Sequence, residues 1–299
     1  MEKAKTVKTP IGDILLKVAN YTILFFLAFV MLFPFWDIFV KSFMSDPDII
    51  KAEGLVFWPT NWHLEAYKTI FENETYNFGR AFLNSVFITV TDTVYQLSIT
   101  ALSAYALTKK TLPGRKFFLV YFMFTMYFGG GMIPYYIVIR ELQLLDKIWV
   151  MIIPSFISIF NVLVMKSFFS ELPEELLDAA RIDGAGDLRT FISIVLPLSK
   201  AVLATIALFI AVGVWNNWFT PMLYIQEDPT IRPLAYALQI IIETSRGVNT
   251  DNPGVGGQVI IGQSIQYAAI VVAVFPIMAV YPFLQKHFTK GVLIGSIKG

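Results

Sequence analysis

Long apolar blocks separated by short polar segments dominate this chain, and they predict membrane-spanning helices. A helix needs about 20 residues to cross about 30 Å of hydrocarbon. Six segments reach that length, at residues 18–40, 82–107, 117–139, 148–169, 199–225 and 264–285. The pattern therefore predicts an all-α integral membrane protein with six transmembrane helices.

The second apolar segment differs from the others because polar residues recur in it every three or four positions. They are Ser85, Thr89, Asp92, Gln96, Thr100 and Ser103. On a helix they share one face, which must meet protein or water because lipid cannot satisfy its hydrogen bonds. Two interpretations stay open, a translocation path and a polar helix–helix interface. Asp92 is the most informative member, because carboxylates inside membranes tend to be functional. Near the outer end of the helix it would simply be hydrated.

Lysine and arginine side chains near the ends of the segments predict the orientation. One set of connecting loops and termini carries fifteen of them and the other set eight. Residues 108–116 contain four, which are Lys109, Lys110, Arg115 and Lys116. Both termini are therefore expected in the cytoplasm. The first apolar segment is too long for a cleaved signal peptide, so we expect a retained signal-anchor helix.

The external connections at 42–81 and 226–263 are the longest. The first, which includes Trp58 and Trp62, is expected to form short helices lying at the membrane interface, and the second contains a strong turn signal at 251–254.

Composition excludes several functions. The chain has 299 residues, of which 56% are hydrophobic and 15% charged, and its net charge of +1 offers no field that would attract nucleic acid. It has no cysteine and only two histidines, His63 and His287, far apart in sequence, so no metal site is expected. No phosphate-binding loop, nucleophile elbow or zinc-protease motif occurs. We expect no catalytic residue and no cofactor in this chain. The pair Asp46 and Asp48 would suit a glycosyltransferase, but a hydrated loop explains it as well.

A charged stretch at 170–197, between two apolar segments, predicts a helix followed by a bend. Pro173 suits a first helical turn, and Glu174 and Glu175 suit the positive end of the helix dipole. Leu172, Leu176 and Ala179/Ala180 recur at helical spacing and give a narrow apolar stripe.

The second half of this stretch predicts another short helix. Gly184 and Gly186 can end the first helix in a left-handed conformation. Asp187 can cap the second helix, whose Phe191 and Ile194 would point back toward the membrane. Pro197 then opens the fifth apolar segment. The expected result is two short helices at a sharp angle.

The spacing acid-Ala-Ala-x3-Gly-x9-Ile-x-Leu-Pro in this stretch resembles the cytoplasmic signature loop of ABC importer permeases. The tail 285–299, the run 215–218 (Trp-Asn-Asn-Trp) and the run 129–134 (Gly-Gly-Gly-Met-Ile-Pro) are similar to permeases of the branch that imports oligosaccharides and complex polysaccharide fragments. One departure is Asp178, where the family usually has glutamate. The carboxylate is kept, with a reach shorter by one methylene.

The resemblance implies that the loop couples transport to ATP hydrolysis in a partner. The residues it assigns to coupling are Glu174, Asp178, Ala179, Ala180, Asp183, Gly184, Leu196 and Pro197. It implies a second, homologous permease subunit, two ATP-binding subunits that hold ATP and magnesium, an extracellular or periplasmic solute-binding protein and a carbohydrate substrate. The location implied is the bacterial cytoplasmic membrane. Without the resemblance, an ordinary amphipathic helix at the bilayer surface would explain the stretch.

Candidate substrate contacts combine flat aromatic faces with amides, which suits sugars. They are Asp92, Gln96, Tyr127, Tyr135, Trp215, Asn216, Asn217 and Trp218. The alternative for the tryptophans is an aromatic belt at the membrane surface. In this family the main sugar contacts can also lie in the partner permease.

The organisation expected is an N-terminal part at 1–80, a permease transmembrane domain at 81–285 and a cytoplasmic tail at 286–299. Two rival functions are an ion-gradient-driven secondary transporter and a channel subunit. The first would usually show an internal repeat and more buried charges, and the second a filter-like loop, for which Gly129–Gly131 is a thin basis.

Overall fold

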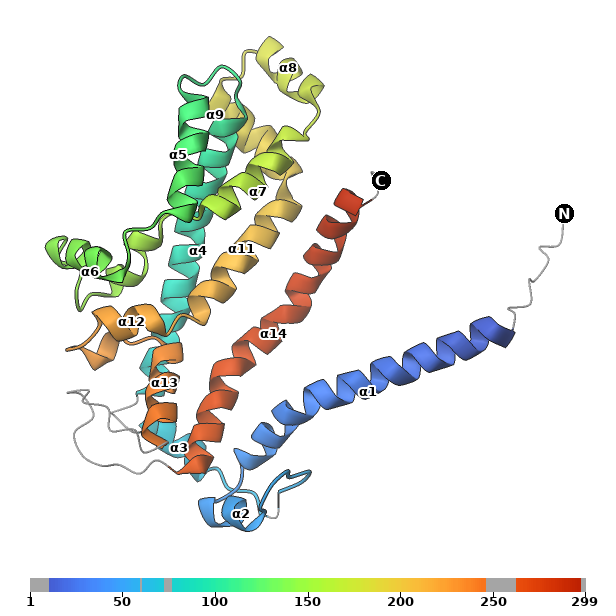
Figure 1. The fold of residues 1–299 in the computed structure, drawn as a ribbon, viewed down its shortest axis with the longest axis vertical. Coiled ribbons are helices and arrows are strands. Elements are labelled where there is room, and N and C mark those ends of the chain that lie inside the picture. Colours follow the sequence, from blue (N-terminus) through green and yellow to red (C-terminus); the bar gives the residue numbers. More distant parts are fainter. Residues whose placement is uncertain (1–10, 60, 73–76, 246–261, 297–299) are drawn as a thin grey trace. The chain divides into compact units, whose positions relative to one another are not determined.

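The computed structural model describes residues 11–59, 61–72, 77–245 and 262–296, with the backbone alone for residue 11 and for 281–296. Every regular element in those ranges is helical, as predicted (Figure 1). The chain divides into two compact units, Met1–Thr69 with Gly262–Val271, and Ile70–Ile261 with Val272–Gly299. Each unit is described by itself below.

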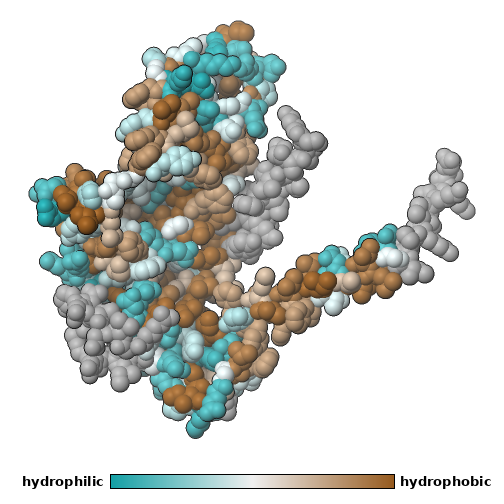
Figure 2. Space-filling model, in the orientation of Figure 1, coloured by the Kyte–Doolittle hydropathy of each residue, from teal (hydrophilic) through white to brown (hydrophobic). Residues whose placement is uncertain are grey.

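The first unit is built on α1 (Ile11–Lys41), with the short helices α2 (Asp46–Lys51) and α3 (Glu65–Glu72) after it. Nearly all side chains along α1 are exposed, and Figure 2 shows them as an almost continuous apolar surface. The stretch Gly12–Lys41 of this helix is long and apolar enough to cross a membrane. Short helices are expected in the segment after the first span, and α2 and α3 are found there, while Trp58 and Trp62 lie between them in non-helical chain.

Buried polar contacts close the end of α1. Asp37 pairs with Lys41 at 2.7 Å and accepts the Val56 N–H at 2.7 Å. Both charged side chains are nearly buried, and such pairs persist only when their remaining groups are also satisfied. Asp46, a member of the acidic pair noted above, accepts the Ser264 N–H at 2.8 Å near the start of α14 (Gln263–Ser296). The Asp46 carboxylate is therefore a structural cap.

The second unit is organised around α4 (Phe78–Thr108), which packs against α7 (Ile159–Ser170) and α11 (Lys200–Trp215). These three helices lie side by side in Figure 1. Their shared core includes Ala104, Val162, Met165 and Ile206, each of which is 0% exposed. Small side chains on α4 let the neighbouring helices approach closely.

Three of the predicted spans are interrupted, which corrects the expectation of single helices. The third is split into α5 (Arg115–Tyr127) and α6 (Met132–Glu141), bent by 112°. The fourth consists of η1 (Ile148–Met151) and η2 (Ile153–Ser155), followed by α7 at 47°. The first break falls on the run of three glycines at 129–131. Gly131 there has φ +84°, a conformation that residues with a side chain disfavour.

The fifth predicted span ends early, at Trp215, and continues after a break as α12 (Phe219–Tyr224). The segment after it contains η4 (Pro229–Ile231) and α13 (Leu234–Ser245), a helix that the sequence pattern did not predict. The turn signal at 251–254 lies outside the described residues. By length and composition, two described helices can cross a membrane, or up to five if each bent pair is one span.

Candidate functional site: a polar cavity and the 170–197 loop

A cavity of about 690 Å³ lies within the second unit. Its walls come from α4, from the break between α5 and α6, from η1–η2, and from the ends of α11 and α12. The cavity therefore sits where three of the four neighbouring elements lose regular helix. Backbone groups freed at such breaks are tolerated at membrane depth only against protein or a water-filled space.

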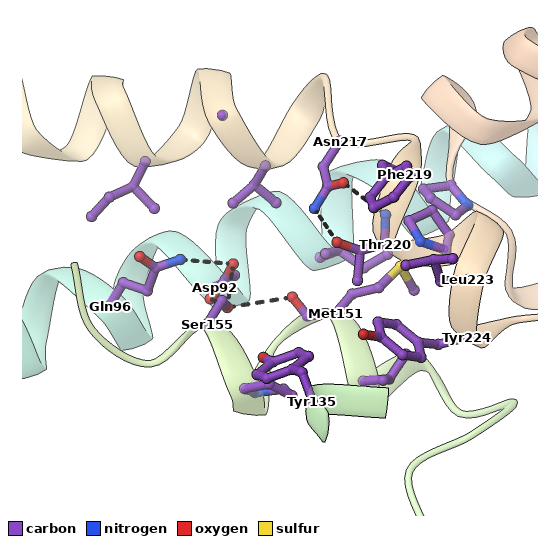
Figure 3. Close-up of a pocket in the computed structure, with 18 of the residues that line it drawn as sticks. Asp92, Gln96, Tyr135, Met151, Ser155, Asn217, Phe219, Thr220, Leu223 and Tyr224 are labelled. Carbon is purple, nitrogen blue, oxygen red and sulfur yellow. Dashed lines mark hydrogen bonds between the residues drawn. The ribbon is translucent and has the colours of Figure 1, made fainter. Parts of the chain in front are cut away.

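Asp92 is the centre of the polar wall (Figure 3). Its carboxylate accepts Gln96 Nε2 at 3.0 Å, one helical turn along α4, and Ser155 Oγ from η2 at 2.9 Å. The residue is only 1% exposed. Among the cavity's lining residues, all within the described part of the chain, Asp92 is the one carboxylate and no lysine, arginine or histidine occurs.

Ser155 has a single hydroxyl proton, for which the Asp92 carboxylate competes with the carbonyl oxygens of Ile152 and, at a longer 3.5 Å, Met151. Its Oγ lies 2.9 Å from Asp92 Oδ1 and 2.8 Å from the Ile152 carbonyl oxygen. A carboxylate offers about four lone-pair sites. With Gln96 and Ser155 as its partners, Asp92 retains capacity to accept hydroxyl groups of a ligand.

Further polar groups line the rest of the cavity. Asn217 Nδ2 donates to Thr220 Oγ1 at 2.9 Å, and Asn217 Oδ1 accepts the Thr220 N–H at 3.1 Å. The buried hydroxyl of Thr89 lines the cavity without a hydrogen-bond partner in the described part of the chain. Tyr135 and Tyr224 lie 6.4 Å apart, ring to ring. The walls thus mix amide, hydroxyl and aromatic groups.

The structure brings together four of the eight candidate substrate residues, namely Asp92, Gln96, Tyr135 and Asn217. The other four lie outside the cavity lining. Trp215 donates to the Ala273 carbonyl at 3.3 Å, Asn216 donates to the Val212 carbonyl at 2.8 Å, Trp218 packs on Phe219, and Tyr127 is 79% exposed. Ser155, Thr220 and Tyr224 line the cavity and were not singled out, because single polar residues beside helix breaks carry no periodic signal.

In the 170–197 loop, α8 (Glu174–Ile182) is followed by α9 (Asp187–Thr190). Gly184 has φ +73°, as expected of the residue that ends the first helix. Two details differ from expectation. Gly186 has φ −69° and precedes α9 as its N-cap residue, so it is not left-handed. Asp187 is the first residue of α9, and its carboxylate turns to Lys109 instead of capping the helix.

The apolar stripe of α8 also differs from expectation. Ala180 is buried, and Leu172 and Leu177 pack against the core of α4, α7 and α11. Leu176 is 44% exposed, because the helix is rotated so that Leu177 faces inward instead.

The other residues assigned to coupling lie mostly at the surface. Asp178 pairs with Arg181 at 2.9 Å, and both side chains are more than half exposed. Glu174, Ala179, Asp183, Gly184 and Pro197 are exposed, and Leu196 is partly buried.

Lys109 and Asp187 form the shortest ion pair of this region, at 2.8 Å. The Lys109 hydrogen bond holds the pKa of the Asp187 carboxyl below its usual range. Burial alone would lower the pKa of Lys109, but its interactions with the Asp187 carboxylate and the Tyr105 side chain outweigh burial and raise it. The raised pKa of Lys109 and the lowered pKa of Asp187 keep both groups charged at neutral pH.

An all-helical chain with long exposed apolar helices and a polar cavity among broken ones has the architecture of a membrane transport protein. Residues 9–294 match the family described as "Binding-protein-dependent transport system inner membrane component", and the chain belongs to that family. It is accordingly an inner-membrane transport subunit of a binding-protein-dependent system.

Individual relatives agree with this assignment. The chain is 43% identical over 270 residues to "Protein LplC" of Bacillus subtilis (strain 168), covering 90% of each chain. It is 39% identical over 280 residues to the "Polygalacturonan/rhamnogalacturonan transport system permease protein YtcP" of the same organism, covering 93% of this chain and 96% of that one. It also resembles a solved chain of a bacterial ABC transporter involved in the import of the acidic polysaccharide alginate. That match has a TM-score of 0.80 and 30% identity, and it covers 95% of this chain and 100% of the other.

Proposed function

We propose that this chain is a transmembrane permease subunit of an ATP-driven importer that takes up oligosaccharides delivered by a solute-binding protein. The observation that carries the proposal is the family match over residues 9–294. The named polysaccharide permease among the relatives and the alginate importer among the solved structures support the carbohydrate assignment. A permease of arabinooligosaccharides, from Halalkalibacterium halodurans, is 29% identical over 278 residues and supports the same class.

The proposed topology has six spans with both termini in the cytoplasm. The two long helices and the three bent pairs support five spans, the third pair only through α11, because its first member, Asp187–Leu198, belongs to the proposed coupling loop. Helix α4 adds the sixth. Its polar stripe lowers its hydropathy, yet its 31 residues are more than long enough to cross. The cations at 108–116 support the orientation. The parts at 1–80, 81–285 and 286–299 remain our proposed organisation.

The loop at 170–197 is the proposed contact with the two ATP-binding subunits, which would hold ATP and magnesium. Its outer surface is strongly apolar for an exposed loop, with Ile182 86% and Leu188 64% exposed. Exposed apolar groups beside Asp178 and Glu174 suit a partner cleft that has an apolar floor and basic rims. The exposed Ala179 permits close approach, and Gly184 sets the angle between α8 and α9.

The cavity is the proposed sugar route through this subunit. Asp92, Gln96 and Asn217 can exchange their present hydrogen bonds for those of sugar hydroxyls, and Tyr135 offers an aromatic face. A carboxylate in a lining without cations disfavours a substrate carboxylate, because two like charges would share a poorly hydrated space. The sugar units that touch this subunit are therefore proposed to be uncharged, unlike the acidic polysaccharide of the alginate importer.

In the proposed cycle, closure of the two ATP-binding subunits moves the 170–197 loop. The paired permease subunits then change from inward-open to outward-open, and the binding protein releases sugar into the cavity. Reopening of the ATP-binding subunits after hydrolysis returns the inward-open state. This chain supplies no hydrolytic group and acts through position alone.

Purification of the tagged protein in mild detergent tests the assembly. Mass spectrometry should identify a second permease and an ATP-binding protein in the wild type, and Asp178→Lys and Gly184→Trp should lose the ATP-binding protein. A protein that purifies alone and monodisperse in every case would contradict the proposal.

Uptake by vesicles of the reconstituted complex should require ATP and no ion gradient. Neutral oligosaccharides should compete for uptake better than uronate oligosaccharides of equal length.

A further inference from the structure

The end of α4 meets the α9 region at two points that are one helical turn apart. Lys109 Nζ pairs with Asp187 at 2.8 Å. The Tyr105 ring packs on the Phe191 ring, with centroids 5.0 Å apart. Each element contributes residues four positions apart, which lie on one face of a helix. Two contacts at matching spacing restrict both the separation and the angle between the two elements, whereas a single contact would leave a pivot.

Both contacts are anchored on the α4 side. The Lys109 side chain is only 16% exposed, and its ammonium also lies 4.4 Å from the centre of the Tyr105 ring. A largely buried ammonium needs a nearby anion, because its lost hydration is otherwise uncompensated. Tyr105 and Phe191 are 7% and 5% exposed and belong to the core that α4 shares with α7 and α11. The α9 region is thus attached to packed structure.

By contrast, α8 is held through the buried Ala180 and through Leu177, which packs against the shared core, and its polar attachment to the α4 side is weak. The ion pair from Lys110 to Glu174 of α8 spans 3.4 Å, and its side chains are 84% and 80% exposed. Pairs of that kind contribute little to stability. Only the inner apolar face of α8 is fixed, so a force on its exposed face passes on through the α9 region, which has both a polar and an aromatic contact with the α4 side.

Helix α4 is a suitable receiver because it is continuous. It runs for 31 residues with no proline and with glycine only at Gly79, near its start. Lys109 directly follows the last residue of α4 and is 17 positions from Asp92, so about 25 Å of helix separates the two. The direct chain connection from α9 to α11 is bent by 83° near Ser199, and π-helical η3 (Phe191–Val195) and α10 (Leu196–Leu198) intervene. A bent connection transmits position less directly than a straight helix.

We propose that Tyr105 and Lys109 of α4, with Asp187 and Phe191 of the α9 region, form a clamp that transmits movement of the coupling loop along α4 to the Asp92 wall of the cavity. The four are positioning residues and touch neither substrate nor nucleotide. The inference rests on the proposed coupling role of residues 170–197, and it adds the route by which the movement reaches the cavity.

The test compares Lys109→Met with Lys110→Met in the complete transporter reconstituted in vesicles. The two neighbours lose the same charge, but only Lys109 belongs to the clamp. We expect Lys109→Met to assemble and hydrolyse ATP at the wild-type rate while sugar uptake per ATP falls about tenfold, a typical size for a lost coupling energy. Lys110→Met should resemble the wild type, and Lys109→Arg should restore uptake because it keeps the charge.

A second measurement uses the absence of native cysteine. Lys109→Cys combined with Asp187→Cys, joined by a short bifunctional thiol reagent, should regain the uptake per ATP that the untreated double variant loses. A bridged variant without uptake would show that α9 slides on α4 during the cycle and would overturn the clamp, as would normal coupling in Lys109→Met. A parallel fall of ATPase activity and uptake would reduce these residues to a structural role. Wild-type uptake that proceeds without ATP would instead overturn the proposed function, and the clamp with it.

Discussion

Two carboxylates, Asp92 near the middle of α4 and Asp187, which pairs with Lys109 just after the end of α4, have opposite surroundings. Asp92 is 1% exposed and accepts hydrogen bonds from the neutral groups of Gln96 and Ser155. The Asp187 side chain is 76% exposed and pairs with the Lys109 ammonium. Neutral donors can be exchanged for the hydroxyls of a passing ligand at little cost, whereas the ion pair keeps one partner. The comparison separates a group suited to transient binding from one suited to attachment.

Replacing Asp92 by leucine is expected to have the largest effect. The change removes the cavity's carboxylate and leaves the Gln96 and Ser155 donors without this acceptor. Leucine also cannot accept hydrogen bonds from the sugar. Two lost hydrogen bonds to sugar hydroxyls, at about 1.5 kcal/mol each, correspond to about a hundredfold loss of uptake. Uptake by the reconstituted complex measures it. Val94→Leu, on the exposed side of the same helix, is the control. Normal uptake by Asp92→Leu would remove the cavity from the sugar route.

Asp92→Asn sharpens the same comparison, because the amide oxygen can still accept from Ser155 while the charge is lost. Uptake should fall only about tenfold, the effect of one weakened hydrogen bond of about 1.4 kcal/mol. If Asn and Leu are equally damaging, the negative charge itself is required, and Asp92 acts by a means other than exchange of hydrogen bonds.

Replacing Gly184 by valine disturbs the bend between α8 and α9, close to Asp187, and leaves the cavity unchanged. At φ +73° a β-branched side chain costs about 1–2 kcal/mol, so the angle between α8 and α9 should change. We expect uptake per ATP to fall about tenfold, with normal insertion in the membrane. Gly186→Ala is the matched control, since Gly186 has φ −69° and an added Cβ would have nothing within 4 Å. Equal behaviour of the two variants would refute the bend as a coupling element.

Asp187→Asn tests the ion pair with Lys109 directly, and its expected effect is a small loss of thermal stability. The Asp187 side chain is 76% exposed but that of Lys109 is only 16% exposed. The pair should therefore contribute about 1 kcal/mol, the upper end of the range for exposed pairs, which corresponds to a Tm lowered by about 2 °C at neutral pH. The pKa of Asp187 is lowered in the folded protein, so its contribution is present above the unfolded pKa, about 3.9, and is lost as the pH falls further. Thermal unfolding of purified wild type and variant should therefore converge in acid. A constant Tm difference at all pH values would contradict the ion pair.

Lys110→Met is expected to have the smallest effect. Its 3.4 Å pair with Glu174 is almost fully exposed on both sides, and such pairs are screened by water and salt. Thermal unfolding and uptake should both match the wild type. A Tm loss as large as that of Asp187→Asn would mean that exposure does not distinguish the two attachments.

Periodicity predicted more of the site than composition did. The three-to-four-residue spacing on α4 indicated a polar face, and Ser85, Thr89, Asp92 and Gln96 of that face line the cavity. The Trp215–Trp218 run was selected by residue type alone, and only Asn217 reaches the lining. Residue type indicates what a side chain can bind, but the direction of a side chain at a helix break depends on the dihedral angles of that break.

The sequence by itself determined the helical class, the apolar segments, the polar face of α4 and the bend at Gly184. Each of these depends on neighbouring positions in one segment. Only the tertiary structure decided that three spans are broken, that Ser155 meets Asp92 across 63 positions, and that Lys109 meets Asp187 across the loop. Those contacts join residues whose separation in sequence contains no information about their distance in space, because the packing of α4 against α7 and α11 sets it.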